Sequence, residues 1–156
     1  MNITLFQPDM AANAAAAIRL AACLGVPVWM IEPCGFVWDE RRLRRVGMDY
    51  LDQVDLRRWP SWEAFERRRR ADGKRLILLT TKASTPYHLI DYRHGDILLG
   101  GSESAGVPDD VHAASDLRVS VPMAPNARSL NLVTSLAIVI GEALRQTDGF
   151  PKPADC

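Results

Sequence analysis

Polar side chains gather just before the longest apolar stretch of the chain. Asn126, Arg128, Ser129 and Asn131 precede or interrupt the start of a segment, residues 130–144, in which apolar side chains dominate. The first turn of a helix leaves its backbone N–H groups unpaired. These side chains therefore favour a cradle for a polar ligand at a helix start, and the alternative is that Ser129 serves only as the N-cap.

A second candidate for ligand chemistry is the glycine-rich segment GGSESAGVP at residues 100–108. It lacks the Lys-Ser/Thr pair of a P-loop, because Val107 and Pro108 follow Gly106, and it does not match G-x-G-x-x-G. Its glycines either permit close approach of the backbone to a ligand or serve a turn. Glu103 either accepts hydrogen bonds from ligand hydroxyls or pairs with an arginine.

Composition fits one ordinary domain. The chain has 156 residues, of which 47% are hydrophobic and 24% charged, so we expect a single domain over residues 1–156, with 148–156 as a tail. The start has neither a basic region nor a long apolar run, which predicts no signal peptide, no membrane anchor and a cytoplasmic protein. The three cysteines and three histidines show no metal-ligand spacing, so we expect no metal.

Positive charge is concentrated in one part of a chain whose formal net charge is zero. Residues 41–75 hold twelve Lys and Arg against six Asp and Glu, with tryptophans close by. Such a mixture suits a polyanion, whose phosphates bind through charge and whose bases stack on aromatic rings. The alternative is a solvated helix face.

Strand and helix patterns alternate along the chain. We expect strands at residues 2–6, 28–31, 53–56, 75–80, 96–99 and 117–121, and helices at 14–24 with Asn13 as N-cap, 39–46, 62–71, 108–114 and 130–146. This order predicts an α/β fold, a mainly parallel sheet with helices on both faces. Ligands of such sheets bind beyond the carboxyl ends of the strands, here in loops 79–84, 100–108 and 123–131.

The last expected helix is apolar on almost every side but is too short to span a bilayer, which needs about 20 apolar residues. Protein must therefore surround it, either from this chain or from a second copy.

Four segments in the same order resemble the SPOUT class of S-adenosylmethionine-dependent methyltransferases over nearly the whole chain. Three of them are Asn13 with Arg19, GGSESAG, and VPMAPNARSLNL. The fourth, IEPCGFVWDERRLRRVGMDY at residues 31–50, looks like the subfamily that methylates the ribose 2'-hydroxyl of the wobble nucleotide, cytidine or modified uridine, in leucine tRNAs. The resemblance implies a C-terminal segment tucked through a loop as a trefoil knot.

The resemblance also implies a pocket for S-adenosylmethionine as cofactor. Its expected residues come from all three loops at the carboxyl ends of strands: Leu79, Thr80, Gly101, Val121, Met123, Ser129 and Leu130.

Roles in catalysis and tRNA binding follow from the same resemblance. Arg19 corresponds to the family's catalytic arginine, and Asn13 shapes its loop. Asn131 fixes the knot loop and faces the substrate, while Arg128 lies beside the cofactor and meets a tRNA phosphate. The further tRNA contacts are expected from Arg41, Arg42 and Arg45. The alternatives are a surface salt bridge for Arg19 and a dimer contact for Arg128.

Several positions depart from the family pattern. Relatives often have glycine and a second asparagine after the Asn13 position, an arginine in the second motif, and in some cases a tyrosine in the last helix. This chain has alanine at residues 14–17, Ala105 and Gly141 instead, so any substrate contact from those side chains is absent. We expect a homodimeric tRNA methyltransferase that pairs through its last helix, and the alternatives are 2'-O-methylation of another tRNA or rRNA site or a noncatalytic RNA-binding module.

Overall fold

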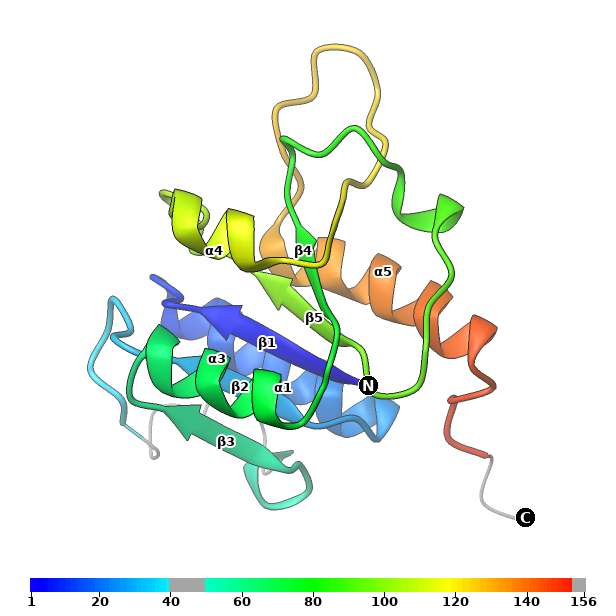
Figure 1. The fold of residues 1–156 in the computed structure, drawn as a ribbon. Helices are drawn as coiled ribbons and strands as arrows, with labels where there is room; N and C mark the ends of the chain where they lie inside the picture. The colour runs from blue at the N-terminus through cyan, green and yellow to red at the C-terminus, as the bar shows by residue number, and fades with distance from the viewer. Residues whose placement is uncertain (40–49, 153–156) are drawn as a thin grey trace.

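A six-stranded parallel sheet forms the centre of the molecule (Figure 1). The computed structural model describes residues 1–39 and 50–152. Neighbouring strands follow the order β3-β2-β1-β5-β4-β6, and every neighbouring pair is parallel. The strands are β1 Asn2–Phe6, β2 Val28–Ile31, β3 Leu56–Trp59, β4 Leu76–Leu79, β5 Ile97–Gly100 and β6 Leu117–Val119.

Helices cover both faces of this sheet. α1 (Ala11–Leu24) and α5 (Leu132–Gln146) share one buried cluster with strand residues such as Ile3 and Leu5. On the other face, α3 (Trp62–Ala71) and α4 (Asp109–Ala114) pack against residues such as Leu76 and Leu78. Alternate residues of a strand point to opposite faces, so strands buried on both sides carry continuous apolar runs. The expected α/β architecture is confirmed, and two short 3-10 helices, η1 (Tyr50–Asp52) and η2 (Tyr87–Leu89), join its elements.

Two strands differ from the expected ranges by more than one residue. The strand expected at 53–56 is β3, which starts at Leu56 because its register with β2 pairs Val28 with Leu56 and Ile31 with Trp59. The strand expected at 117–121 ends at Val119, after which Ser120 forms an isolated bridge with Pro86. Apart from Asp39, the basic helix expected at 39–46 lies outside the described residues.

The expected N-cap of the first helix is wrong. α1 starts at Ala11 with Met10 as its N-cap residue, and the backbone N–H groups of Asn13 and Ala14 donate to the Met10 carbonyl oxygen. The helix therefore begins a turn earlier than a cap at Asn13 allows, and the buried Asn13 side chain is engaged elsewhere.

Asn131, not Ser129, caps the last helix. The Asn131 Oδ1 accepts from the backbone N–H groups of Val133 at 2.9 Å and Thr134 at 3.2 Å. The helix starts at Leu132 rather than at Leu130. The interpretation of Ser129 as an N-cap is therefore wrong, and Ser129 lies in the loop before the helix.

The last helix is only partly enclosed by its own chain. Leu136, Val139, Ile140, Ala143 and Leu144 are buried against the sheet and α1. A second stripe is only half-buried, and its members are Val133, Ala137, Ile138 and Gly141. None of the helices within residues 1–39 and 50–152 has the length and apolar character needed to cross a bilayer. The knot that the resemblance implies stays a prediction.

Candidate functional site

A cavity of about 510 Å³ lies at the carboxyl ends of β4 and β5. Its walls come from the start of α1, from the loops that follow β4, β5 and β6, and from the start of α5. In Figure 1 the loop between β6 and α5 extends beyond the sheet beside the loop that follows β4. This volume falls within the range of about 300–1,000 Å³ that is typical of small-molecule sites.

All seven residues expected to bind the cofactor line this one cavity. They are Leu79, Thr80, Gly101, Val121, Met123, Ser129 and Leu130, and Asn13 and Asn131 line it as well. Parallel strands bring the loops at their carboxyl ends to the same edge of the sheet. The structure therefore gathers residues that are up to 118 positions apart, as the Asn13–Asn131 contact illustrates.

Two positions of the 100–106 loop have no room for a side chain, which explains the glycines there. A Cβ at Gly101 would lie 2.6 Å from the carbonyl carbon of Gly106, and a Cβ at Gly100 would lie 2.7 Å from Leu132 Cδ1. Ser102 and Gly106 exchange two backbone hydrogen bonds of 2.9 Å each, and Gly106 has φ 72°. The loop is thus a tight turn, and Gly101 and Gly106 also line the cavity wall.

Glu103 joins two parts of the site through its two carboxylate oxygens. Oε1 accepts from Asn13 Nδ2 at 2.7 Å, and Oε2 accepts from the backbone N–H of Asp9 at 2.7 Å. Asn131 Nδ2 in turn donates to Asn13 Oδ1 at 3.1 Å. These bonds fix the Asn13 amide at both ends, so that three cavity-lining side chains from distant segments form one network.

Asp9 extends this network, and the sequence patterns did not single it out. Its Oδ2 accepts from the Ser104 hydroxyl at 2.6 Å and from the Ser104 backbone N–H at 2.9 Å. These hydrogen bonds from the Ser104 hydroxyl and backbone hold the pKa of Asp9 below its ordinary value. The available signal was its position three residues beyond the carboxyl end of β1.

Two expected site arginines lie outside the cavity lining. Arg19 is exposed on α1, six residues beyond Asn13, and its guanidinium carbon lies 5.6 Å from the centre of the Tyr50 ring. Arg128 is exposed in the loop between β6 and α5. Neither belongs to the residues that line the 510 Å³ cavity.

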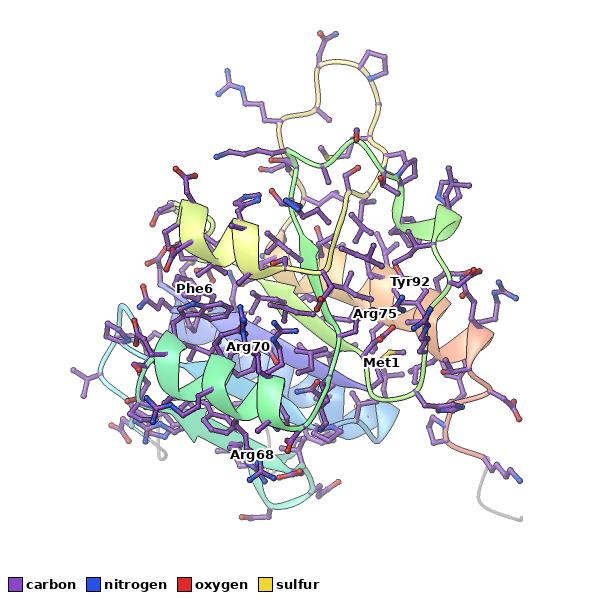
Figure 2. The ribbon with its side chains drawn as sticks, in the orientation of Figure 1. Met1, Phe6, Arg68, Arg70, Arg75 and Tyr92 are labelled. Carbon is purple, nitrogen blue, oxygen red and sulfur yellow. The ribbon has the colours of Figure 1, made fainter. Side chains whose placement is uncertain are left out.

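The basic segment divides into structural and surface arginines. Arg41, Arg42 and Arg45 lie outside the described residues. In α3, Arg69 is 7% exposed and is bound to Glu66, to Asp116 and to the carbonyl oxygens of Lys74 and Ala114. Arg68 and Arg70 of the same helix are labelled in Figure 2. Both also pair with carboxylates, Arg68 with Asp72 and Arg70 with Glu66.

Within residues 41–75, Arg69 fits neither alternative, a polyanion site or a solvated helix face, because its side chain is buried. Arg69 has a structural role. Its buried guanidinium donates hydrogen bonds to Glu66 and Asp116 and to two backbone carbonyl oxygens, which compensate the cost of burying its charge.

The cavity also contains residues that the motifs did not indicate. Lys82 lies in the loop after β4, His112 comes from α4, and Ser135 faces the cavity one helical turn after Asn131. Helical spacing from Asn131 was the available signal for Ser135. Lys82 and Glu103 give the cavity one positive and one negative side chain.

Comparisons with known proteins agree with the geometry. Residues 1–141 match the model of the SpoU rRNA Methylase family. The chain is 51% identical over 153 residues to a tRNA (cytidine(34)-2'-O)-methyltransferase of Beijerinckia indica subsp. indica, covering 98% of this chain and 96% of the relative. A second relative of the same description, from Escherichia coli, is 37% identical and covers 97% of this chain and 96% of the relative.

Solved structures share the fold at full length or as one part of a longer chain. One is described as giving structural insights into the 2-OH methylation of C/U34 on tRNA. Its TM-score is 0.87 and its sequence identity 36%, and the match covers 93% of this chain and 94% of that one. Another is a SpoU methyltransferase from Streptomyces viridochromogenes in complex with AdoMet, with a TM-score of 0.81, 26% identity and coverage of 94% and 57%. Sequence, fold and the position of the cavity thus lead to one conclusion, that the chain belongs to the SpoU rRNA methylase family.

Proposed function

We propose that this protein methylates the ribose 2'-hydroxyl of the wobble nucleotide, cytidine or modified uridine, in tRNA, leucine tRNAs included, with S-adenosylmethionine as cofactor. The observation that carries the proposal is the single cavity lined by all seven expected cofactor residues, in a chain 51% identical to a tRNA (cytidine(34)-2'-O)-methyltransferase. Residues 1–156 act as one domain, with 148–156 as a tail, and the enzyme works in the cytoplasm.

The side chains around the cavity suit S-adenosylmethionine. Val121, Met123 and Leu130 offer apolar surface for the adenine ring. Hydroxyls of Thr80 and Ser129 suit the polar groups of the ribose and the amino acid, and Lys82 suits the carboxylate. When bound, the cofactor supplies a methyl group activated by a positively charged sulfur.

The residues of the chain supply position and charge for the reaction. Holding the ribose oxygen against the methyl group replaces an encounter in solution, a contribution of about 7–11 kcal/mol in favourable cases. Arg19 stabilises the negative charge that develops on the 2'-oxygen or on an adjacent phosphate. It does not act as a free base, since the pKa of arginine is about 12.5–13.8. Asn13 shapes the loop beside it, and Asn131 and Arg128 face the tRNA.

Methyl transfer to unmodified tRNA tests the function. Purified protein with labelled S-adenosylmethionine should label leucine tRNA transcripts, and nuclease mapping should place the 2'-O-methyl group on nucleotide 34. A tRNA in which the ribose of nucleotide 34 is a 2'-deoxyribose is the matched control and should stay unlabelled. Labelling elsewhere in the tRNA, or in rRNA alone, would favour the other methylation sites, and absence of cofactor binding in calorimetry would favour a noncatalytic module.

Charge reversal tests the tRNA contacts expected from the basic segment. Replacing Arg41, Arg42 and Arg45 with Glu should weaken tRNA binding by at least about tenfold, because phosphate contacts dominate such affinity. Cofactor affinity should stay unchanged, since the cofactor cavity lies between the strand ends. Filter binding and calorimetry measure the two affinities, and an equal loss of both would indicate misfolding instead.

We also propose a homodimer that pairs through the outer stripe of α5. The support is the half-buried apolar stripe of Val133, Ala137, Ile138 and Gly141, which the protein's own chain does not enclose. Ile138→Glu should therefore convert the dimer into a monomer of 17.3 kDa, because a charge cannot stay unpaired in an apolar interface. Sedimentation velocity measures the mass. The control is Ala113→Glu, at an exposed position of α4, which should leave the dimer intact. A wild-type monomer would contradict this proposal.

A further inference from the structure

Asp9 links two segments that are far apart in the sequence. It lies on the short connection between β1 and α1, whereas its partners belong to the loop that follows β5. The Asp9 carboxylate binds both the hydroxyl and the backbone N–H of Ser104, and the Asp9 backbone N–H donates to Glu103. Three hydrogen bonds of 2.6–2.9 Å thus connect one residue to two consecutive residues of the loop.

The loop after β5 has a base and a tip that are held independently. Its base is closed by the two backbone hydrogen bonds between Ser102 and Gly106, in which Asp9 takes no part. Its tip, Glu103 and Ser104, is held by Asp9. The base contains Gly101, which lies at the expected cofactor position, and the tip contains the carboxylate that orients Asn13.

We infer that Asp9 is a positioning residue for methyl transfer, an inference that rests on the proposed function. By fixing the loop tip, it holds the Glu103 carboxylate, which holds the Asn13 amide, which in turn contacts Asn131. Loss of the Asp9 carboxylate frees Ser104 and leaves the loop tip, which carries Glu103, held only by the Asp9 backbone N–H, while the base of the loop stays closed. The consequence is a defect in turnover rather than in cofactor binding.

A second contact ties Asp9 to the segment that leads into the basic residues. The backbone N–H of Gly35 donates to the Pro8 carbonyl oxygen at 2.9 Å. A Cβ at Gly35 would lie 2.9 Å from Asp9 Cα, so the two backbones are in direct contact. A methyl group at position 35 must displace Asp9, because its neighbour there is backbone and not the end of a flexible side chain. Gly35→Ala therefore disturbs the same contacts without removing the carboxylate.

The test compares turnover with cofactor affinity in Asp9→Ala. We expect kcat to fall about tenfold, the size of a lost charge-assisted hydrogen bond, while the Kd for S-adenosylmethionine changes by less than about twofold. Amide hydrogen exchange at Ser104, followed by NMR, should become faster while Gly106 stays protected. Asp9→Asn, which keeps an acceptor oxygen, should restore part of the turnover. The control is Asp91→Ala, on the exposed loop before β5, which removes the same charge at the opposite edge of the sheet.

The outcomes distinguish failure of this inference from failure of the proposed function. If the wild type transfers no methyl group to tRNA, the proposed function and this role both fail. If the wild type is active and Asp9→Ala has the same kcat, or loses cofactor affinity as strongly as turnover, positioning by Asp9 is wrong. Gly35→Ala should reproduce the defect, and combining it with Asp9→Ala should add little, since both changes break the same contacts. Additive losses would overturn the link through Gly35.

Discussion

Arg19→Ala is expected to lower kcat for tRNA methylation by about 100- to 1,000-fold, the usual cost of removing a group that stabilises charge in the transition state. The guanidinium is exposed on α1, where it contacts the Tyr50 ring and not the cavity lining. Cofactor affinity should therefore stay close to that of the wild type. Single-turnover kinetics with saturating tRNA and calorimetry with S-adenosylmethionine measure the two effects.

Arg19→Lys tests whether the guanidinium itself is needed. Lysine keeps the positive charge but loses the planar set of donors that matches phosphate and carboxylate geometry. We expect its turnover to remain far below that of the wild type, and near-normal turnover would show that no specific guanidinium role exists. Arg93→Ala, on the exposed loop before β5, removes a positive charge at the opposite edge of the sheet and should keep full activity.

Gly101→Ala is expected to weaken S-adenosylmethionine binding by up to about 100-fold, which corresponds to about 3 kcal/mol of strain. The new Cβ would lie 2.6 Å from the Gly106 carbonyl carbon, and every atom that it meets there belongs to the Gly106 backbone. The turn has to open, and its opening displaces the cavity wall. Calorimetric titration of the folded variant with S-adenosylmethionine measures the loss.

The neighbouring glycine provides a graded comparison for this prediction. A Cβ at Gly100 would meet Leu132 Cδ1 at 2.7 Å, which is the end of a side chain that can rotate away. Gly100→Ala should therefore weaken S-adenosylmethionine binding less than Gly101→Ala does. An unchanged affinity in Gly101→Ala would mean that the turn does not form part of the cofactor site.

Much of the fold follows from patterns within short segments. Four of the six strands were expected to within one residue of their observed bounds, because apolar runs bounded by turn residues are signals that neighbouring residues carry together. The boundaries that failed depend on partners elsewhere. β3 starts at Leu56, in register with Val28 of β2, and Asn13 does not cap α1 because its amide binds Glu103 and Asn131.

The same division holds for the candidate site. Sequence motifs identified the seven cavity residues in three separate loops, and with them the expected cofactor. Asp9 and its role were not visible, because its partners Glu103 and Ser104 lie 94 and 95 residues away. The division of the basic segment was also hidden, since Arg69 is a structural residue through Asp116, 47 residues further along the chain.

What the sequence by itself determined is therefore the order and type of most elements and the residues of three segments that line one cavity. Only the tertiary structure decided which polar side chains meet, since a hydrogen bond between distant segments depends on strand order and loop geometry that no local pattern specifies. Parallel strands place their carboxyl ends at one edge, and at this edge the segments that follow β1, β5 and β6 bring Asp9, Asn13, Glu103 and Asn131 into one network.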